Sequence, residues 1–136
     1  HEVYPVEKGA FETAGEVSGT IKRMLRKLGV PSQVIRRVSV ASYEVELNLV
    51  IHSLGGQMEI FIEPESVTLD VSDRGPGIPD LDLAMQEGWS TASDEVRTLG
   101  FGAGMGLPNM KRNADEFDIR SKVGVGTNIH MKFFCV

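Results

Sequence analysis

The amino-acid sequence predicts an α/β two-layer sandwich, in which a mixed and mostly antiparallel sheet is covered on one face by helices. Two observations lead to this fold class. Apolar residues recur at helical spacing in two long segments of the first half of the chain, and they alternate with polar residues in later pairs of short segments. The predicted order is a strand, two helices, a hairpin, a long loop, a helix and a second hairpin.

Two amphipathic helices are expected before residue 55. The first spans residues 11–28 and ends at Gly29. Pro31 suits the first turn of the second helix, which continues until Gly55-Gly56. Apolar residues at helical spacing mark the two buried faces: Ile21, Met24, Leu25 and Leu28 in the first helix, and Val34, Val38, Ala41 and Val45 in the second.

The strands are expected where apolar and polar residues alternate. Residues 2–8 alternate weakly and suit an edge strand, and residues 58–62 and 67–71 predict an antiparallel hairpin. Residues 117–119 and 129–133 predict a second hairpin at the end of the chain.

Between the two hairpins lies a loop, residues 74–104, that is too long for a passive connection. It contains one short candidate helix at residues 81–86, and a longer helix is expected at residues 106–114. A loop of this length is usually functional or disordered.

Composition limits the classes of function. The chain has 136 residues, 41% of them hydrophobic, which is enough for one domain with its own core, and we expect a single domain over residues 1–136. His1 in place of Met is set aside as a residue left by a tag. The formal net charge of -5 argues against a nucleic-acid or membrane partner and favours a protein or a small molecule.

The lone cysteine, Cys135, excludes an intrachain disulfide and favours a reducing cytoplasm. No apolar run reaches the ~18 residues of a membrane span, and the chain does not open on a signal-peptide pattern. We therefore expect a cytoplasmic protein.

Three short motifs in a fixed order point to an ATP site. Each motif is weak on its own, and the order and spacing of the three carry the prediction. The motifs are Glu44-Val-Glu-Leu-Asn48, Asp73-Arg-Gly75-Pro-Gly77 and Gly100-Phe-Gly102-Ala-Gly104-Met-Gly106.

The first motif places a carboxylate and an amide one helical turn apart. At 100° per residue, Glu44 and Asn48 lie within about 40° of each other, on a mostly apolar side of the helix. Glu46 falls about 200° away from Glu44, so its carboxylate is expected to face water. Without the other motifs, Glu44 equally suits an ordinary, partly exposed helix carboxylate.

The second motif is a carboxylate at a strand end, followed by glycines. Without a Cβ atom at Gly75 and Gly77, a ligand can approach the backbone closely. The carboxylate of Asp73 can accept a hydrogen bond from an exocyclic amine such as that of adenine. An ordinary turn, in which Pro76 fixes one φ angle, explains the same residues.

The third motif does not match the better-known glycine loops. A P-loop needs a Lys after its last glycine, and here there is none. The dinucleotide fingerprint also fails, since Met105 or Leu107 stands where its last Gly belongs. What remains is either a mobile surface loop or a loop whose free amides, entering a helix at Gly104 or Gly106, favour phosphate.

Together, the motifs resemble the N, G1 and G2 boxes of the GHKL ATPase superfamily, which has the Bergerat fold. That superfamily includes DNA gyrase, the MutL repair protein, sensor histidine kinases and bacterial anti-sigma factor serine kinases. The chain is most similar to the anti-sigma regulatory factors, over almost its whole length. The resemblance implies an ATP-dependent serine/threonine protein kinase, which acts as an anti-sigma factor or partner-switching regulator by phosphorylating an anti-anti-sigma-like protein.

The resemblance also implies the roles of the site residues. Glu44 is the general base, and Asn48 holds the Mg²⁺ ion that bridges the phosphates. Asp73 binds the adenine amine, and Thr127 is similar to the late threonine that completes the adenine site. The remaining candidates for ATP binding are Gly75 and Gly77 around the pocket, His52 and Thr91 near the phosphates, and Gly100, Gly102, Gly104, Met105 and Gly106 in the glycine loop. His52 equally suits a polar residue that closes its helix.

One departure keeps alternatives open. Similar kinases often have a basic residue shortly before Gly-Met-Gly, whereas here Gly102 and Ala103 precede Gly104, and the nearest upstream candidate is Arg97. A non-catalytic, ATP-gated protein-binding module and a stand-alone ATPase are therefore the alternative functions. The partners implied are a sigma factor, an anti-anti-sigma-like substrate or both, and a second copy of the chain in a homodimer.

Overall fold

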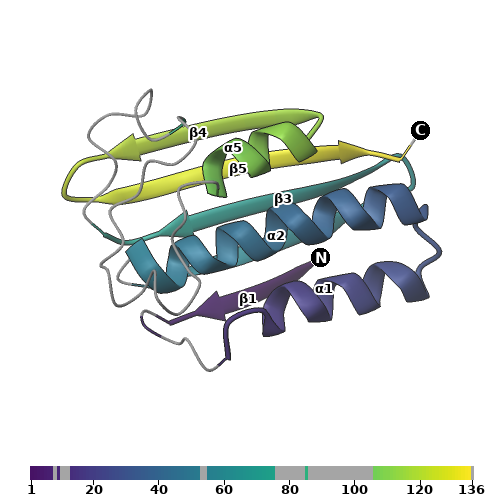
Figure 1. Cartoon of the computed structure of the whole chain (residues 1–136), viewed down its shortest axis with the longest axis horizontal. Helices are drawn as coiled ribbons and strands as arrows, with labels where there is room; N and C mark the ends of the chain where they lie inside the picture. The colour runs from purple at the N-terminus through teal and green to yellow at the C-terminus, as the bar shows by residue number, and fades with distance from the viewer. Residues whose placement is uncertain (8, 10–12, 53–54, 76–84, 86–105, 136) are drawn as a thin grey trace.

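The computed structural model describes residues 1–7, 9, 13–52, 55–75, 85 and 106–135 (Figure 1). The described elements alternate between sheet and helix in the predicted order. They are β1 (Glu2–Val6), α1 (Glu16–Lys27), α2 (Ser32–His52), β2 (Gly56–Ile62), β3 (Ser66–Asp73), α5 (Gly106–Asn113), β4 (Glu116–Lys122) and β5 (Gly126–Phe134).

The five described strands form one sheet in the order β1-β2-β3-β5-β4. Each neighbouring pair is antiparallel, so no parallel pairing occurs among these strands. The three described helices lie together on one face of this sheet, with α2 between α1 and α5 (Figure 1). The predicted two-layer α/β fold is confirmed.

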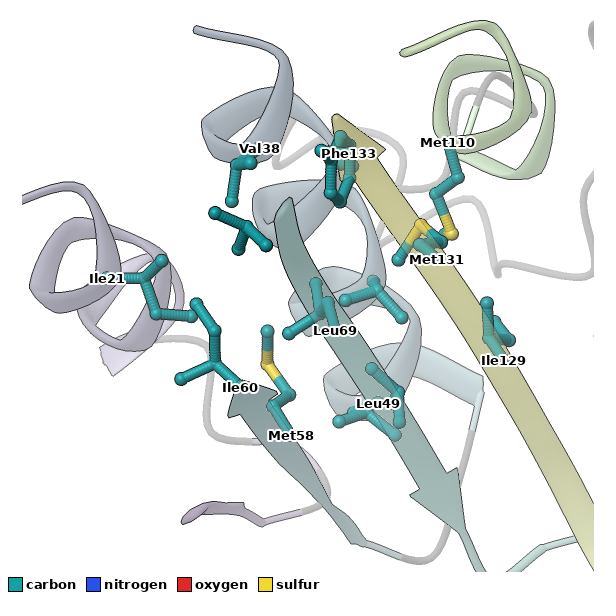
Figure 2. Packing of buried hydrophobic residues seen from close by; sticks show 14 of the residues in the cluster. Ile21, Val38, Leu49, Met58, Ile60, Leu69, Met110, Ile129, Met131 and Phe133 are labelled. Carbon is teal, nitrogen blue, oxygen red and sulfur yellow. The ribbon is translucent and has the colours of Figure 1, made fainter. Parts of the chain in front are cut away.

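The core lies between α2 and the sheet (Figure 2). Period-two alternation points every second side chain of the central strands at the helices, and helical periodicity points one face of each helix back at the sheet. Each fully buried aliphatic or aromatic side chain contributes about 1.5–3 kcal/mol. The fully buried members include Ile21 and Leu25 of α1, Val38, Val45 and Leu49 of α2, Met58 and Ile60 of β2, Leu69 of β3, Met110 of α5, and Met131 and Phe133 of β5.

The opposite face of the sheet is polar. Glu59, Asp70, His130 and Asp118 are cross-strand neighbours in one row from β2 to β4. Within this row, the imidazole of His130 pairs with the carboxylate of Asp70. This alternation between a buried apolar face and a polar face is typical of an antiparallel sheet with helices on one side.

The start of the first predicted helix differs from the structure. The first helix was expected from residue 11, but α1 begins at Glu16, after Gly15. Gly15 has a φ of 98°, which is outside the helical region and suits glycine, so the helix cannot extend back through it. The short helix expected at residues 81–86 falls almost wholly outside the described residues.

The prediction for Glu46 was wrong. Its side chain is 2% exposed, and its carboxylate accepts three backbone hydrogen bonds at the start of α1. Oε2 accepts from the N–H groups of Gly15 at 3.0 Å and Val17 at 3.2 Å, and Oε1 accepts from Ser18 at 3.0 Å. The side of α2 opposite Glu44 faces α1 and not water. Glu46 thus satisfies amides that have no partner within their own helix, at the positive end of the α1 dipole.

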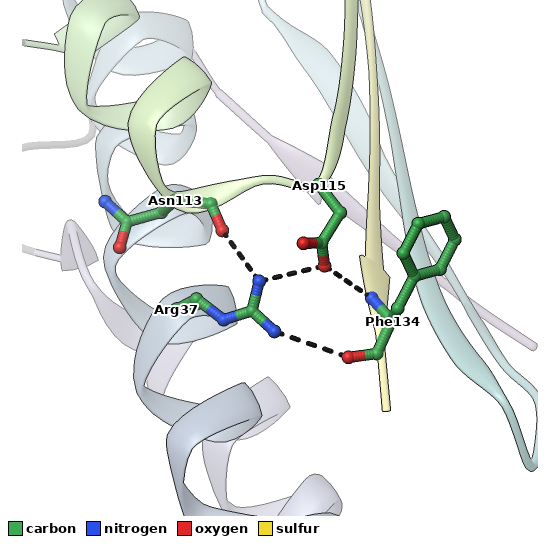
Figure 3. Close-up of polar contacts among 4 residues, drawn as sticks. All are labelled: Arg37, Asn113, Asp115 and Phe134. Atoms are coloured by element: carbon green, nitrogen blue, oxygen red, sulfur yellow. Dashed lines mark hydrogen bonds and ion pairs between the residues drawn. The ribbon is translucent and has the colours of Figure 1, made fainter. Parts of the chain in front are cut away.

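A second polar anchor holds the far end of α2 (Figure 3). The Arg37 guanidinium donates to Oδ2 of Asp115 at 2.8 Å, to the Phe134 carbonyl at 3.3 Å and to the Asn113 carbonyl at 3.5 Å. Asp115 Oδ2 also accepts from the Phe134 N–H at 2.7 Å. Burial alone would raise the pKa of Asp115, but these hydrogen bonds and the Arg37 charge outweigh it and lower the pKa. The anchor ties α2 to the end of α5 and the end of β5.

Replacing Glu46 is expected to destabilise the fold. Glu46→Ala leaves buried amides without an acceptor, and should lower the free energy of unfolding by about 2–4 kcal/mol. Glu46→Gln should also destabilise, since its NH₂ group would face N–H donors. Urea denaturation measures both changes against Glu65→Ala, an exposed carboxylate in the turn between β2 and β3. An unchanged unfolding midpoint for both Glu46 variants would show that the carboxylate does not hold α1.

Candidate functional site

The candidate residues that the structure describes lie toward one end of the sandwich. The end of β3, the start of β5 and the C-terminal half of α2 lie at the same side of the molecule (Figure 1). Gly56 shows how close α2 and β3 are. It is the cross-strand partner of Asp73, and a Cβ atom added to it would lie 3.0 Å from Leu49 of α2. The helix turn that carries Asn48 therefore packs beside the strand end that carries Asp73.

Asp73 is the last residue of β3, and both neighbouring strands approach it closely. Its Oδ1 accepts a hydrogen bond from the backbone N–H of Thr127 at 2.8 Å. A Cβ atom at Gly126 would lie 2.2 Å from the Asp73 carbonyl oxygen, and one at Gly56 would lie 2.9 Å from the Asp73 Cα. Only glycine fits at these two positions, and Gly126 also has a φ of 152°.

Burial shifts the protonation equilibrium of the Asp73 carboxyl. Burial raises the pKa of Asp73 above its ordinary value, and the hydrogen bond from Thr127 partly offsets the increase. Among the described residues, the hydrogen bond from Thr127 reaches the carboxylate at Oδ1.

Thr127 is buried, with 8% of its surface exposed, and it is held by a second strand. Its Oγ1 lies 2.8 Å from Oγ of Ser121, the cross-strand partner in β4. The Ser121 hydroxyl also donates to the Gly126 carbonyl at 3.3 Å. The sequence analysis did not identify Ser121, although the register of the second hairpin would place it opposite Thr127.

Glu44 and Asn48 are half-buried on α2, one turn apart. The side-chain amide of Asn109, in α5, donates to Glu44 Oε1 at 3.3 Å. The sequence analysis missed Asn109 as well. In the sequence, Asn109 is distinguished only by its position three residues after Gly106. The spacing of apolar residues does not show which residue of α2 it contacts.

The structure places a further part of the predicted set. Gly75 follows β3, and its N–H donates to the Val125 carbonyl at 3.2 Å, while Gly106 is the first residue of α5. His52 is the last residue of α2, and its side chain lies outside the described part. The predicted residues that lie outside the described ranges altogether are Gly77, Thr91, Gly100, Gly102, Gly104 and Met105.

Two negative findings concern the described residues. They contain no group of three or more His, Cys, Asp or Glu side chains that could hold a metal ion. Among the described helices, none combines the length and the apolar character that crossing a bilayer requires.

The chain belongs to the histidine kinase-like ATPase domain family, whose model matches residues 10–133. It is 31% identical over 112 residues to the serine/threonine-protein kinase RsbT of Bacillus subtilis, a match that covers 79% of this chain and 78% of RsbT. It is 33% identical over 102 residues to an anti-sigma F factor of Thermoanaerobacter sp. (strain X514), which covers 71% and 68% of the two chains. The predicted superfamily is confirmed.

A comparison of structures supports the same fold. The mycobacterial sensor histidine kinase MprB superimposes with a TM-score of 0.55 and 19% sequence identity, covering 98% of this chain and 97% of that chain. At this identity, the likeness shows the fold alone. The overall fold is thus one that the chain shares with this histidine kinase.

Replacing Asp73 by Asn is expected to stabilise the ligand-free protein at neutral pH. The raised pKa of Asp73 means that the fold favours the protonated carboxyl, so the ionised form costs stability above that pKa. Below the pKa of the unfolded chain, both states are protonated and the cost vanishes. Asn keeps an oxygen acceptor for the Thr127 N–H and carries no charge.

Urea denaturation between pH 7 and pH 3 measures this effect. The advantage of Asp73→Asn over the unaltered chain should be largest at pH 7 and should narrow as the pH falls. Asp118→Asn, on the polar face of the sheet, is the control. If Asp73→Asn is less stable than the unaltered chain at pH 7, or if its gain in stability does not change with pH, the ionised Asp73 carboxylate does not destabilise the fold.

Proposed function

We propose that the chain is a bacterial, ATP-dependent serine/threonine protein kinase that acts as an anti-sigma factor or partner-switching regulator. Its substrate is an anti-anti-sigma-like protein with an acceptor serine or threonine. The observation that carries the proposal is the strand-end carboxylate of Asp73, held by Thr127 between two obligatory glycines. The similarity to RsbT, named a serine/threonine-protein kinase, and to an anti-sigma F factor supports the type of reaction and the type of partner.

The residues around Asp73 fit an adenine base. Asp73 Oδ2 would accept a hydrogen bond from the exocyclic amine while Oδ1 keeps its bond to Thr127. Gly75 carries no Cβ atom, so a flat ring can approach the backbone after β3 closely, and we propose the same role for Gly77 from its residue type. Thr127 and Ser121 would hold the floor of the adenine site through their hydroxyl pair.

The residues of α2 fit the phosphate end of the same ligand. When bound, MgATP supplies the phosphoryl group and the charge neutralisation that its transfer requires. The side-chain oxygen of Asn48 is a ligand of the kind that Mg²⁺ prefers. The Glu44 carboxylate, one turn away, would accept the proton of the attacking hydroxyl. Phosphate contacts from His52, Thr91 and the glycine loop, residues 100–106, complete the proposed site.

We further propose a single domain over residues 1–136 that works in the cytoplasm, binds protein partners and not nucleic acid or membrane, and forms a homodimer. The length and hydrophobic content support one domain, the single cysteine supports the cytoplasm, and the acidic net charge supports the choice of partners. Homodimer formation is the part that size measurement in solution would test directly.

A non-catalytic, ATP-gated binding module is the second candidate. The observation that favours it is Gly102-Ala103 before Gly104, where similar kinases often carry a basic residue. Transfer of labelled phosphate to a partner separates the two functions. Release of phosphate without any partner would instead indicate a stand-alone ATPase.

MgATP is expected to bind and to stabilise the fold. At 100 times its dissociation constant, a ligand that binds the native state alone adds about 2.7 kcal/mol to the free energy of unfolding. Asp73→Asn should lose this stabilisation because an amide NH₂ would face the adenine amine. Calorimetric titration and thermal unfolding with ATP and ADP measure the effect, with Asp118→Asn as the control. If neither nucleotide shifts the unfolding of the unaltered chain, the site does not bind ATP.

Glu44→Gln is expected to separate chemistry from binding. The variant should retain nucleotide affinity within a few-fold, yet transfer phosphate roughly 10² times more slowly, which is the usual contribution of a general base. Asn48→Ala should instead weaken the dependence of the reaction on Mg²⁺. Glu63→Gln, an exposed carboxylate after β2, is the matched control. Unchanged transfer by Glu44→Gln would place the base elsewhere in the chain.

A further inference from the structure

The side chain of Asn109 joins α5 to α2 through a hydrogen bond to Glu44. Asn109 lies half-buried in the first turn of α5, and its Nδ2 donates to Glu44 Oε1 at 3.3 Å. Sixty-five residues separate the two in the chain, so the contact depends on how α5 packs against α2. None of the roles assigned above to the ATP-site residues includes Asn109.

A second hydrogen bond sets the orientation of the Asn109 amide. Arg112 Nη1 donates to Asn109 Oδ1 at 3.1 Å. A guanidinium only donates and an ionised carboxylate only accepts, so a single orientation of the amide satisfies both neighbours. In that orientation the NH₂ group must face Glu44.

The backbone beneath Asn109 is also held in place. The Asn113 side chain donates to the Asn109 carbonyl at 2.8 Å. The neighbours of Asn109 on α5, Leu107 and Met110, are buried in the core. The donor that meets Glu44 therefore stands on a helix whose position is fixed by packing, and not on a freely rotating surface residue.

We propose that Asn109 is a positioning residue for Glu44, which holds the carboxylate in the orientation that accepts the proton of the attacking hydroxyl. A Glu side chain has several rotatable bonds, and a fixed donor selects among the rotamers they allow. The inference rests on the proposed kinase function. It predicts that losing the Asn109 donor lowers the rate of transfer without lowering the affinity for ATP. Among the described residues, Asn109 contacts Glu44, the proposed general base, and does not contact those proposed to bind adenine.

Four variants separate positioning from a structural role of α5. Asn109→Ala removes the donor. Asn109→Asp keeps the shape and the acceptor for Arg112, but it replaces the donor with a carboxylate that repels Glu44. Asn109→Gln keeps a donor on a longer side chain and serves as the conservative rescue. Lys111→Ala, at an exposed position of the same helix, is the matched control.

The experiment measures kcat and KM for ATP in the presence of Mg²⁺, with an anti-anti-sigma-like protein from the same genome as the phosphate acceptor. Calorimetry gives the dissociation constant for ATP, and thermal unfolding gives the melting temperature. Asn109→Ala and Asn109→Asp should lower kcat by about 10-fold or more, because small misplacements of reacting groups slow catalysis strongly. Affinity for ATP should change less than about threefold, Asn109→Gln should recover part of kcat, and Lys111→Ala should change neither quantity.

A double-mutant cycle provides a second test. Because Asn109 acts through Glu44, adding Asn109→Ala to a Glu44→Gln chain should slow transfer little further. If the two residues acted independently, the fold-reductions in kcat of the two single variants would multiply. If the unaltered chain transfers phosphate and the Asn109 variants have unchanged kcat, the positioning role is overturned. Loss of ATP binding together with a lower melting temperature would overturn it in favour of a structural role. If the unaltered chain binds ATP and transfers nothing, the proposed kinase function fails, and the inference fails with it.

Discussion

The enclosure of α2 is the constraint on which the rest of the structure depends. The helix packs against the sheet on one side, against α1 on a second and against α5 on a third. A charged side chain on these sides is costly to bury without a partner, since an unpaired buried polar group costs about 1–3 kcal/mol or more. Glu46 is paired by the α1 amides, Glu44 by Asn109 of α5, and Arg37 by Asp115 and Phe134 (Figure 3).

This constraint links stability to the candidate site. Glu44 and Glu46 stand on the same turn of α2 and point to different neighbours, so the contact that holds α1 and the contact that orients the proposed base share one stretch of backbone. At the end of β3, by contrast, a site residue lowers the stability of the fold. Burial raises the pKa of Asp73, so the fold would be more stable with this carboxyl group protonated. Perturbed pKa values of this kind occur often at functional sites.

The order of elements and the two-layer fold follow from local patterns, because periodicity of 3.6 and of 2 depends on neighbouring residues alone. The family follows instead from the resemblance of the three motifs to those of known ATPases. The same patterns placed Glu44 beside Asn48 on one helix face, and Asp73 at the end of a strand. The position of Glu46 could not be derived in this way. The helical wheel gave its direction correctly relative to Glu44, but only the packing of the chain shows that α1, and not water, lies in that direction.

The same reasoning explains the two residues that the patterns missed. Both residues act through contacts between different elements. Ser121 contacts Thr127 across a hairpin, and Asn109 contacts Glu44 between two helices that are distant in the chain. Their residue types are common on surfaces, so nothing local distinguishes them. Contacts of this kind require the register of the strands and the docking of the helices to be known first.

The central claim is that the end of β3 and the start of β5 bind the base of an adenine nucleotide. The most direct measurement is an amide ¹H–¹⁵N spectrum of the labelled protein, titrated with Mg²⁺ and ADP. The account predicts that the signals of Gly75 and Thr127 shift together with one binding constant, while those of Thr68 and Lys132, paired five residues further along their strands, stay in place. Shifts confined to the polar face of the sheet, or no shift at Thr127 under saturating nucleotide, would contradict it.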